Sequence, residues 1–205
     1  MHMKTPKIKT LFLDIGGVLL TNGWDHKSRE KAAKHFKLDS EEMNERHHLT
    51  FDTYESGKLS LDEYLNRVVF YEKRTFSKEK FKTFMFNESK PLDNAIDFFK
   101  TLKKKFNLRV VALSNEGREI NDYRIKKYML DELFDGFVSS CFVHLRKPDI
   151  DIYKLACDVS NTKPGNALCI DDRLMFIQVA QSHGIRTYHF QDLASAKKQL
   201  VKILA

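Results

Sequence analysis

Five short apolar segments, each followed by polar residues or a turn, constrain the fold of this chain more than any other feature. The intervals between most of them show the spacing of amphipathic helices. Continuous apolar strands that alternate with helices are typical of a parallel sheet covered by helices on both faces. We therefore predict an α/β fold with strands at Leu11–Leu13, Val110–Leu113, Gly136–Ser139, Ala167–Ile170 and Ile185–Phe190.

Helical periodicity is clearest in three segments between these strands. Apolar residues recur every three or four positions from Leu92 to Phe106, which predicts one amphipathic helix. Further helices are expected over Tyr153–Val159 and Leu174–His183. These helices supply the apolar faces that a parallel sheet needs on both sides.

Residues 21–87 interrupt the alternation. This segment has no strand candidate, and its helix signals include a capping box at Ser60–Glu63. A helical block of this length exceeds a simple crossover between neighbouring strands. We predict that residues 21–87 form a helical cap subdomain inserted after the first strand, and that residues 1–20 and 88–205 form the core.

The composition is that of a folded domain. Of the 205 residues, 42% are hydrophobic and 31% charged, which excludes an intrinsically disordered chain. No apolar run approaches the roughly 20 residues that span a bilayer. Residues 1–10 lack the features of a signal peptide, so we expect a cytoplasmic protein that does not bind membranes. Cys141, Cys157 and Cys169 are predicted to be reduced and buried.

The net charge of +7 raises the question of nucleic-acid binding. The lysines, however, are spread over helical segments such as DFFKTLKKKF and SAKKQLVKIL, as on solvated helix faces. No basic motif interleaved with aromatic residues accompanies them. We therefore expect no nucleic-acid partner, although a positive field also attracts small anionic substrates.

Polar clusters follow four of the predicted strands, at the sheet edge where ligands bind in open α/β sheets. A strand-end aspartate can act as a nucleophile that becomes an aspartyl phosphate. Hydroxyl and backbone N–H groups can hold phosphate oxygens, a lysine can neutralise charge, and further carboxylates can bind Mg²⁺. The clusters are Asp14, Ser114–Asn115, Arg146–Pro148 and Asp171–Asp172.

Four segments of the core resemble, in order and spacing, the motifs of the haloacid dehalogenase-like (HAD) hydrolases with a helical cap in the first insertion position, the C1 type. They are LFLDIGGVL, VVALSN, LRKPDIDIY and CIDD. The segment FDTYESGKLSLDEYLNRV is similar to the cap of that family, with a glycine turn before a helix. The resemblance covers essentially the whole chain, and it implies a Rossmann-like core and a hydrolase.

The resemblance also implies roles for individual residues. Asp14 corresponds to the nucleophile, and Lys147 to the lysine that stabilises both the nucleophile and the phosphate. Ser114 corresponds to the phosphate-binding hydroxyl, and Asn115 follows it in the phosphate loop.

A Mg²⁺ site is the second implication of the resemblance. Its ligands would come from Asp14, the backbone carbonyl of Gly16, and the acidic pair Asp171 and Asp172. We favour Asp172 as the direct ligand and Asp171 as a neighbouring group, although the sequence also permits the reverse.

Gly16 departs from the motif of typical HAD phosphatases. They carry Asp-x-Asp, and the second aspartate protonates the leaving alcohol and then activates water. Such acid–base help is worth roughly 10²–10⁴-fold in rate, so its loss predicts slower catalysis. A second departure is Phe176, in a region where many relatives carry an asparagine.

Three explanations of Gly16 remain open. The chain is a phosphatase whose acid comes from elsewhere, such as Glu116 or a cap residue. It is alternatively a dehalogenase-type hydrolase, because a halide leaves without a proton. The third alternative is a weak or silent member that binds a phosphorylated ligand. We interpret the chain as a Mg²⁺-dependent phosphomonoesterase for a small phosphorylated metabolite, with sugar phosphates as the first candidates.

Several residues near the expected site have two interpretations. Arg146 and Arg173 fit a surface ion pair as well as a role in the site. His47 and His48 are neighbours on a helix, where side chains diverge by about 100°, so they make a poor metal pair and fit the surface or interface of the cap. Trp24 fits hinge or cap packing better than substrate contact. Neither the oligomeric state nor the substrate follows from the sequence.

Overall fold

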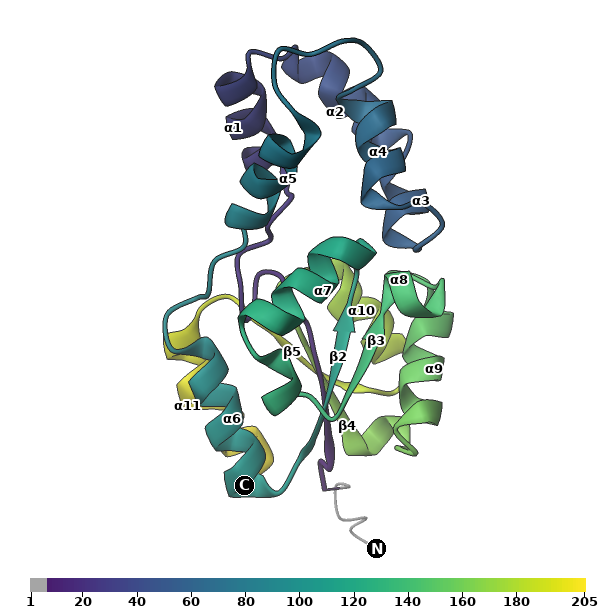
Figure 1. Ribbon diagram of the computed structural model, residues 1–205. Helices are drawn as coiled ribbons and strands as arrows, with labels where there is room; N and C mark the ends of the chain where they lie inside the picture. The colour runs from purple at the N-terminus through teal and green to yellow at the C-terminus, as the bar shows by residue number, and fades with distance from the viewer. Residues whose placement is uncertain (1–6) are drawn as a thin grey trace, which may run out of the picture.

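The centre of the molecule is a five-stranded sheet whose neighbouring strands all pair in parallel (Figure 1). The computed structural model describes residues 7–205. Residues 1–6, part of the N-terminal segment in which we expect no signal peptide, lie outside the described residues. In spatial order the strands are β3 (Gly136–Ser139), β2 (Arg109–Ser114), β1 (Thr10–Leu13), β4 (Ala167–Asp171) and β5 (Arg186–His189). All five predicted strands are confirmed, and the last is one residue shorter at each end.

The central strand β1 supplies apolar side chains to both faces of the sheet, because successive side chains of a strand point in opposite directions. Leu11 and Leu13 pack in one apolar cluster with α6 (Ala95–Phe106) and α11 (Leu193–Leu204). Phe12 lies on the other face, in a cluster with α9 (Ile150–Val159) and α10 (Leu174–Ser182). Figure 1 shows the two helix pairs on opposite sides of the sheet, as predicted.

The ends of the helices follow local capping residues. The helix predicted from Leu92 begins at Ala95, because Asn94 has a left-handed backbone with a φ of 58°. Asp149 caps α9, since its side chain accepts a hydrogen bond from the backbone N–H of Asp151. The remaining core elements are α7 (Arg118–Lys127), α8 (Ser140–Val143) and the short 3-10 helices η1 (Leu130–Glu132) and η2 (Pro164–Asn166).

The helices between β1 and α6 have an apolar core of their own, which includes Phe36, Leu65 and Phe81. Figure 1 shows this helical block beyond the carboxyl ends of the strands. The predicted capping box at Ser60 is present. The boundaries of a separate subdomain at residues 21 and 87 stay a prediction. They are consistent with the separate apolar clusters of the sheet region and of the helical block. The five helices are α1 (His26–Phe36), α2 (Ser40–His48), α3 (Phe51–Glu55), α4 (Leu61–Val68) and α5 (Lys78–Asn87).

Helix α3 rests on the short helix that follows β3. The Ser140 hydroxyl donates a hydrogen bond of 2.6 Å to the backbone carbonyl of Glu55. Gly57 has a φ of +68°, and a Cβ atom there would lie 2.2 Å from the Cys141 carbonyl oxygen. A glycine is therefore required for this close approach. The contact fixes one side of the helical block over the edge of the sheet.

Two predictions that we made from the sequence composition can be compared with the structure of residues 7–205. Cys141, Cys157 and Cys169 are buried free thiols, as expected. Within residues 7–205, no helix is long and apolar enough to cross a membrane.

Candidate active site

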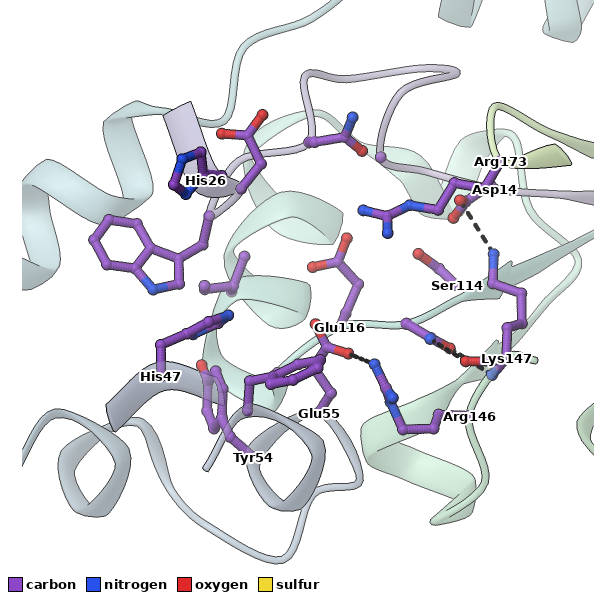
Figure 2. Close-up of a pocket in the computed structure, with 18 of the residues that line it drawn as sticks. Asp14, His26, His47, Tyr54, Glu55, Ser114, Glu116, Arg146, Lys147 and Arg173 are labelled. Atoms are coloured by element: carbon purple, nitrogen blue, oxygen red, sulfur yellow. Dashed lines mark hydrogen bonds and ion pairs between the residues drawn. The ribbon is translucent and has the colours of Figure 1, made fainter. Parts of the chain in front are cut away.

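A cavity of about 330 Å³ lies between the helical block and the carboxyl edge of the sheet. Figure 2 shows the side chains that point into it from both sides. The core contributes five of the predicted site residues to its wall, namely Asp14, Gly16, Ser114, Asn115 and Lys147. The parallel strands thus bring together groups that lie up to 133 positions apart in the sequence, since Asp14 and Lys147 face the same space.

Lys147 links two carboxylates of the site. Its Nζ atom lies 2.6 Å from Oδ2 of Asp171 and 3.1 Å from Oδ2 of Asp14. All three side chains are buried or nearly so. Burial lowers the pKa of Lys147, but the two carboxylates outweigh it and hold the pKa above its ordinary value. The lysine is therefore a permanent buried cation beside Asp14.

The position of Lys147 is set by groups around its backbone and side chain. The Asn115 amide donates to the Lys147 carbonyl and accepts from the Lys147 N–H, both at 2.8 Å. The ammonium group lies 5.0 Å from the centre of the Phe176 ring. Phe176, the second departure from the family pattern, thus packs against Lys147, the candidate catalytic lysine. The Asn115 side chain holds the lysine segment, and its predicted role in phosphate binding stays a prediction.

Asp14 and Ser114 both face the cavity from strand ends. The backbone N–H of Asp14 donates 3.0 Å to the carbonyl of Ile170, which continues the pairing of β1 with β4. Oδ1 of Asp14 accepts a 2.8 Å hydrogen bond from the N–H of Ile15. Ser114 is the last residue of β2, and its hydroxyl has no hydrogen bond to another residue of the described chain. Both side chains are therefore held where a ligand can reach them.

Asp14, Asp171 and Asp172 form a cluster in which one carboxylate oxygen of each lies within 4.8 Å of the others. Burial first, and then Asp14, raise the pKa of Asp171 to about 6, against the opposing effect of Lys147. The same two causes raise the pKa of Asp172. Three carboxylates this close repel one another unless a cation lies between them.

The donor set fits Mg²⁺, which prefers hard oxygen ligands. Both oxygens of Asp171 are engaged, one by Lys147 and one by the N–H of Arg173 at 2.8 Å. Oδ1 of Asp172, in contrast, is buried without a hydrogen-bond partner in the described chain. A Cβ atom on Gly17 would lie 2.2 Å from Asp172, so this glycine makes room for the carboxylate. The geometry agrees with our preference for Asp172 as the direct ligand.

Gly16 borders a second buried ion pair that the sequence did not indicate. A Cβ atom at position 16 would lie 3.8 Å from Nη1 of Arg124 and 3.0 Å from Oδ1 of Asn22. The Arg124 guanidinium is fully buried, and it contacts Oε1 of Glu116. Glu116 and Arg124 therefore lie beside the space that the second aspartate of the usual motif would enter.

Glu116 points into the cavity (Figure 2). Burial raises its pKa to about 7, while Arg124 acts in the opposite direction and Asp14 adds to the increase. Its backbone N–H donates 3.0 Å to the Ser140 hydroxyl, which also holds helix α3. Arg124 itself carried no sequence signal, because its contacts form only when α7 packs against the loop after β1.

Arg146 joins the core to the helical block. It forms ion pairs of 2.5 Å with Asp52 and with Glu55 of α3, and it lies 4.9 Å from the Phe51 ring. Arg146 also lines the cavity. Its side chain therefore makes ion pairs and borders the site as well, which are the two interpretations that the sequence left open. Arg173 lines the cavity as well.

On the side of the helical block, the cavity is lined by Trp24, which we predicted to pack, and by His47, which we predicted at a surface or interface of that block. Both make hydrogen bonds to the Tyr64 hydroxyl. Trp24 also packs edge-on against Phe81, so its packing prediction is confirmed. The signal that could have found this cluster is the recurrence of aromatic and histidine residues between Trp24 and Tyr64.

The fold and the strand-edge carboxylates define a hydrolase of the HAD type. The profile of the family described as haloacid dehalogenase-like hydrolase matches residues 8–184. The chain belongs to this family.

Curated relatives are longer than this chain. Drimenol cyclase of Aspergillus calidoustus is 29% identical over 205 residues, which are 96% of this chain and 36% of the relative. A phosphorylated carbohydrates phosphatase of Thermotoga maritima is 28% identical over 128 residues, 62% of this chain and 55% of the phosphatase. The chain thus spans only about a third to a half of these two proteins.

Solved structures share the fold. A HAD family enzyme of Bacteroides thetaiotaomicron, in complex with magnesium and inorganic phosphate, has a TM-score of 0.77 and 22% identity, covering 92% of this chain and 98% of the enzyme. An L-2-haloacid dehalogenase has a TM-score of 0.63 and 15% identity, covering 88% and 83% respectively. At these identities the similarity establishes the fold.

The carboxylate cluster predicts that the effect of substituting Asp172 on thermal stability depends on Mg²⁺. Asp172→Asn removes a buried charge that Asp14 disfavours, so we expect the metal-free variant to melt a few degrees higher, since about 1 kcal/mol shifts Tm by roughly 2–4 °C in a chain of this size. Mg²⁺ should raise the Tm of the wild type and leave that of Asp172→Asn unchanged. Thermal unfolding in EDTA and in Mg²⁺ measures both effects.

Asp158→Asn, on the exposed face of α9, is the matched control and should keep the Mg²⁺ response. An equal Mg²⁺-induced rise in Tm for Asp172→Asn would show that this residue is not a ligand.

Proposed function

We propose that this chain is a Mg²⁺-dependent phosphomonoesterase in which Asp14 forms an aspartyl phosphate. The observation that carries the proposal is the buried link from Asp14 through Lys147 to Asp171, beside an Asp172 oxygen without a partner. A nucleophilic carboxylate held next to a permanent cation suits attack on an anionic phosphate. The magnesium and phosphate bound by the Bacteroides enzyme of the same fold support this reading.

The proposed reaction has two displacements. A carboxylate oxygen of Asp14 bonds to phosphorus as the ester oxygen leaves with a proton as an alcohol. Water then attacks phosphorus, the bond between phosphorus and Asp14 breaks, and inorganic phosphate leaves. Lys147 stabilises the negative charge in both steps, and the Ser114 hydroxyl holds a phosphate oxygen.

The residues that would hold Mg²⁺ are Asp14, Asp172 and the backbone carbonyl of Gly16, with Asp171 beside them. When bound, the ion would neutralise the repulsion between the carboxylate nucleophile and the phosphate.

We further propose that residues 21–87 act as a cap that encloses a small substrate. The cavity of about 330 Å³ is bounded by the helical block on one side and by Asp14 on the other. Enclosure excludes water and strengthens the electrostatic interactions of the site. Small phosphorylated metabolites fit this space, and sugar phosphates are the first candidates, in line with the carbohydrate phosphatase among the relatives.

Glu116 is our candidate for the acid–base group that Gly16 lacks. Its buried carboxyl faces the cavity from the loop after β2, two residues beyond Ser114. The raised pKa, about 7, leaves both protonation states available near neutral pH. The protonated carboxyl would donate to the leaving alcohol, and the carboxylate would accept a proton from the attacking water.

The first prediction of this mechanism concerns p-nitrophenyl phosphate, whose leaving group needs no proton. Formation of the aspartyl phosphate should be fast, and its hydrolysis should limit turnover. Rapid-mixing experiments should therefore show a burst of p-nitrophenol close to the enzyme concentration. The burst should require Mg²⁺ and disappear in Asp14→Asn.

Other outcomes identify the alternatives. Linear release without metal dependence would contradict the aspartyl-phosphate mechanism. Halide release from 2-haloacids would favour a dehalogenase, the activity in the name of the structural neighbour described above. No turnover, together with a higher Tm in one phosphorylated ligand, would favour a silent binding protein.

The second prediction concerns Glu116. Glu116→Gln preserves the shape of the side chain and should lower steady-state turnover by about 10²–10⁴-fold. With p-nitrophenyl phosphate, for which hydrolysis of the aspartyl phosphate limits turnover, the carboxylate form is the one required as base. The wild-type rate should therefore rise with pH through about 7, and Glu116→Gln should lose that rise. Steady-state rates across a pH series measure both effects.

Glu119→Gln is the matched control, because Glu119 lies outside the cavity and bonds to the N–H of Leu61. The double variant Gly16→Asp with Glu116→Gln asks whether the usual acid restores turnover. A Glu116→Gln enzyme with nearly wild-type turnover and pH profile would place the acid–base group elsewhere.

A further inference from the structure

The cap end of the cavity contains a hydrogen-bond chain of three aromatic side chains. The indole N–H of Trp24 lies 2.9 Å from the Tyr64 hydroxyl oxygen, and that oxygen lies 2.8 Å from Nδ1 of His47. Tyr64 is fully buried and His47 nearly so. The chain is held at its start by Arg29, whose guanidinium donates to the Trp24 carbonyl and to the Asn44 amide oxygen.

The direction of the first hydrogen bond is determined by its chemistry, whereas that of the second depends on the tautomer of His47. An indole N–H can only donate, so the Tyr64 oxygen accepts from Trp24. The single hydroxyl proton of Tyr64 is then available for His47, and we infer that Nδ1 of the imidazole accepts it. Burial, Arg29 and His48 lower the pKa of His47 to about 3, which keeps the ring neutral. A neutral ring that accepts at Nδ1 carries its proton on Nε2.

The Nε2–H group is the free end of this chain. It has no hydrogen bond to any residue within 7–205, yet His47 lines the cavity. Figure 2 shows the ring directed into the cavity, at the opposite end from Asp14. The Phe51 ring stacks on the imidazole with a centroid distance of 4.9 Å, which limits its rotation. The donor is therefore fixed both in protonation and in direction.

The charges nearby indicate what this donor meets. Asp25, Glu55 and Glu116 line the same cavity, and so do Arg29, Arg146 and Arg173. The lining therefore carries both signs of charge and gives a second anionic group of a ligand no net attraction. A hydroxyl group, in contrast, can donate to a carboxylate and accept from an N–H at the same time. An uncharged hydroxyl can thus use both kinds of group in this lining, the His47 donor and a carboxylate acceptor.

We propose that the Nε2–H of His47, oriented by Trp24 and Tyr64, determines specificity by donating a hydrogen bond to an uncharged oxygen of the substrate, remote from the phosphate. This assignment rests on the proposed phosphomonoesterase function. His47 is the residue that touches the substrate, whereas Tyr64 and Trp24 are positioning residues. Substrates with a hydroxyl or carbonyl oxygen at that end should be preferred over alkyl phosphates of similar size.

The protonation assignment can be tested without activity. Long-range ¹H–¹⁵N NMR spectra of the free protein near neutral pH should show His47 as the neutral form with hydrogen on Nε2. Tyr64→Phe keeps the ring but removes the hydroxyl, so it should give a mixture of the two tautomers. A wild-type ring protonated on Nδ1 would overturn the proposal.

The specificity is tested by the ratio of kcat/KM for the best substrate in a panel of sugar and polyol phosphates to that for hexyl phosphate. His47→Phe keeps the stacked ring and should lower this ratio about three- to tenfold, the effect of one neutral hydrogen bond. His47→Gln, which retains an N–H donor, should lower it less. His35→Phe makes the same change on an exposed part of α1 and should keep the wild-type ratio.

Two results separate this proposal from the function on which it rests. If Mg²⁺-dependent p-nitrophenyl phosphate hydrolysis is present but His47→Phe leaves the ratio unchanged, or hexyl phosphate is the better wild-type substrate, the role of His47 is wrong. If no phosphate ester is hydrolysed at all, the proposed function fails, and the NMR spectra still decide the orientation of the donor.

Discussion

The ammonium group of Lys147, shared by Asp14 and Asp171, is the interaction on which the rest of the site depends. A buried charge is costly unless it is paired and hydrogen-bonded. The pairing requires three segments to meet at one edge of the sheet, the ends of β1 and β4 and the loop that carries the lysine. The Asn115 amide, from the end of β2, fixes that loop through two hydrogen bonds. The parallel register of the sheet is therefore what makes the charge arrangement possible.

The site keeps charges that the fold does not neutralise. Asp172 has no ion pair in the described chain, and one of its buried oxygens has no hydrogen bond. Glu116 is balanced only in part, because Arg124 opposes but does not cancel the effect of burial on its pKa. Such groups lower the stability of a domain, and they persist at sites where a ligand or a reaction uses them. Here Asp172 lies against Gly17, and Glu116 contacts Arg124 beside Gly16, where the usual acid is missing.

Much of the fold and part of the site could be predicted from the sequence. Features encoded by a local sequence pattern were predictable, whereas contacts between segments distant in the sequence were not. The strands were predicted because each is a continuous apolar run, and Asp14, Ser114 and Lys147 because they follow such runs. The contact of Arg124 with Glu116 joins α7 to a loop, and no local pattern encodes it. The bond from Tyr64 to His47 joins two helices in the same way. These contacts exist only once the elements have packed.

The central claim is that Asp14 carries the phosphoryl group during the reaction. Acid quenching during steady-state hydrolysis of p-nitrophenyl phosphate with Mg²⁺, followed by peptide mass spectrometry, measures this directly. The account predicts one phosphoryl group on the peptide that contains Asp14, and its loss when Mg²⁺ is replaced by EDTA. Turnover accompanied by an unmodified Asp14 peptide, or by phosphate on Ser114 instead, would contradict it.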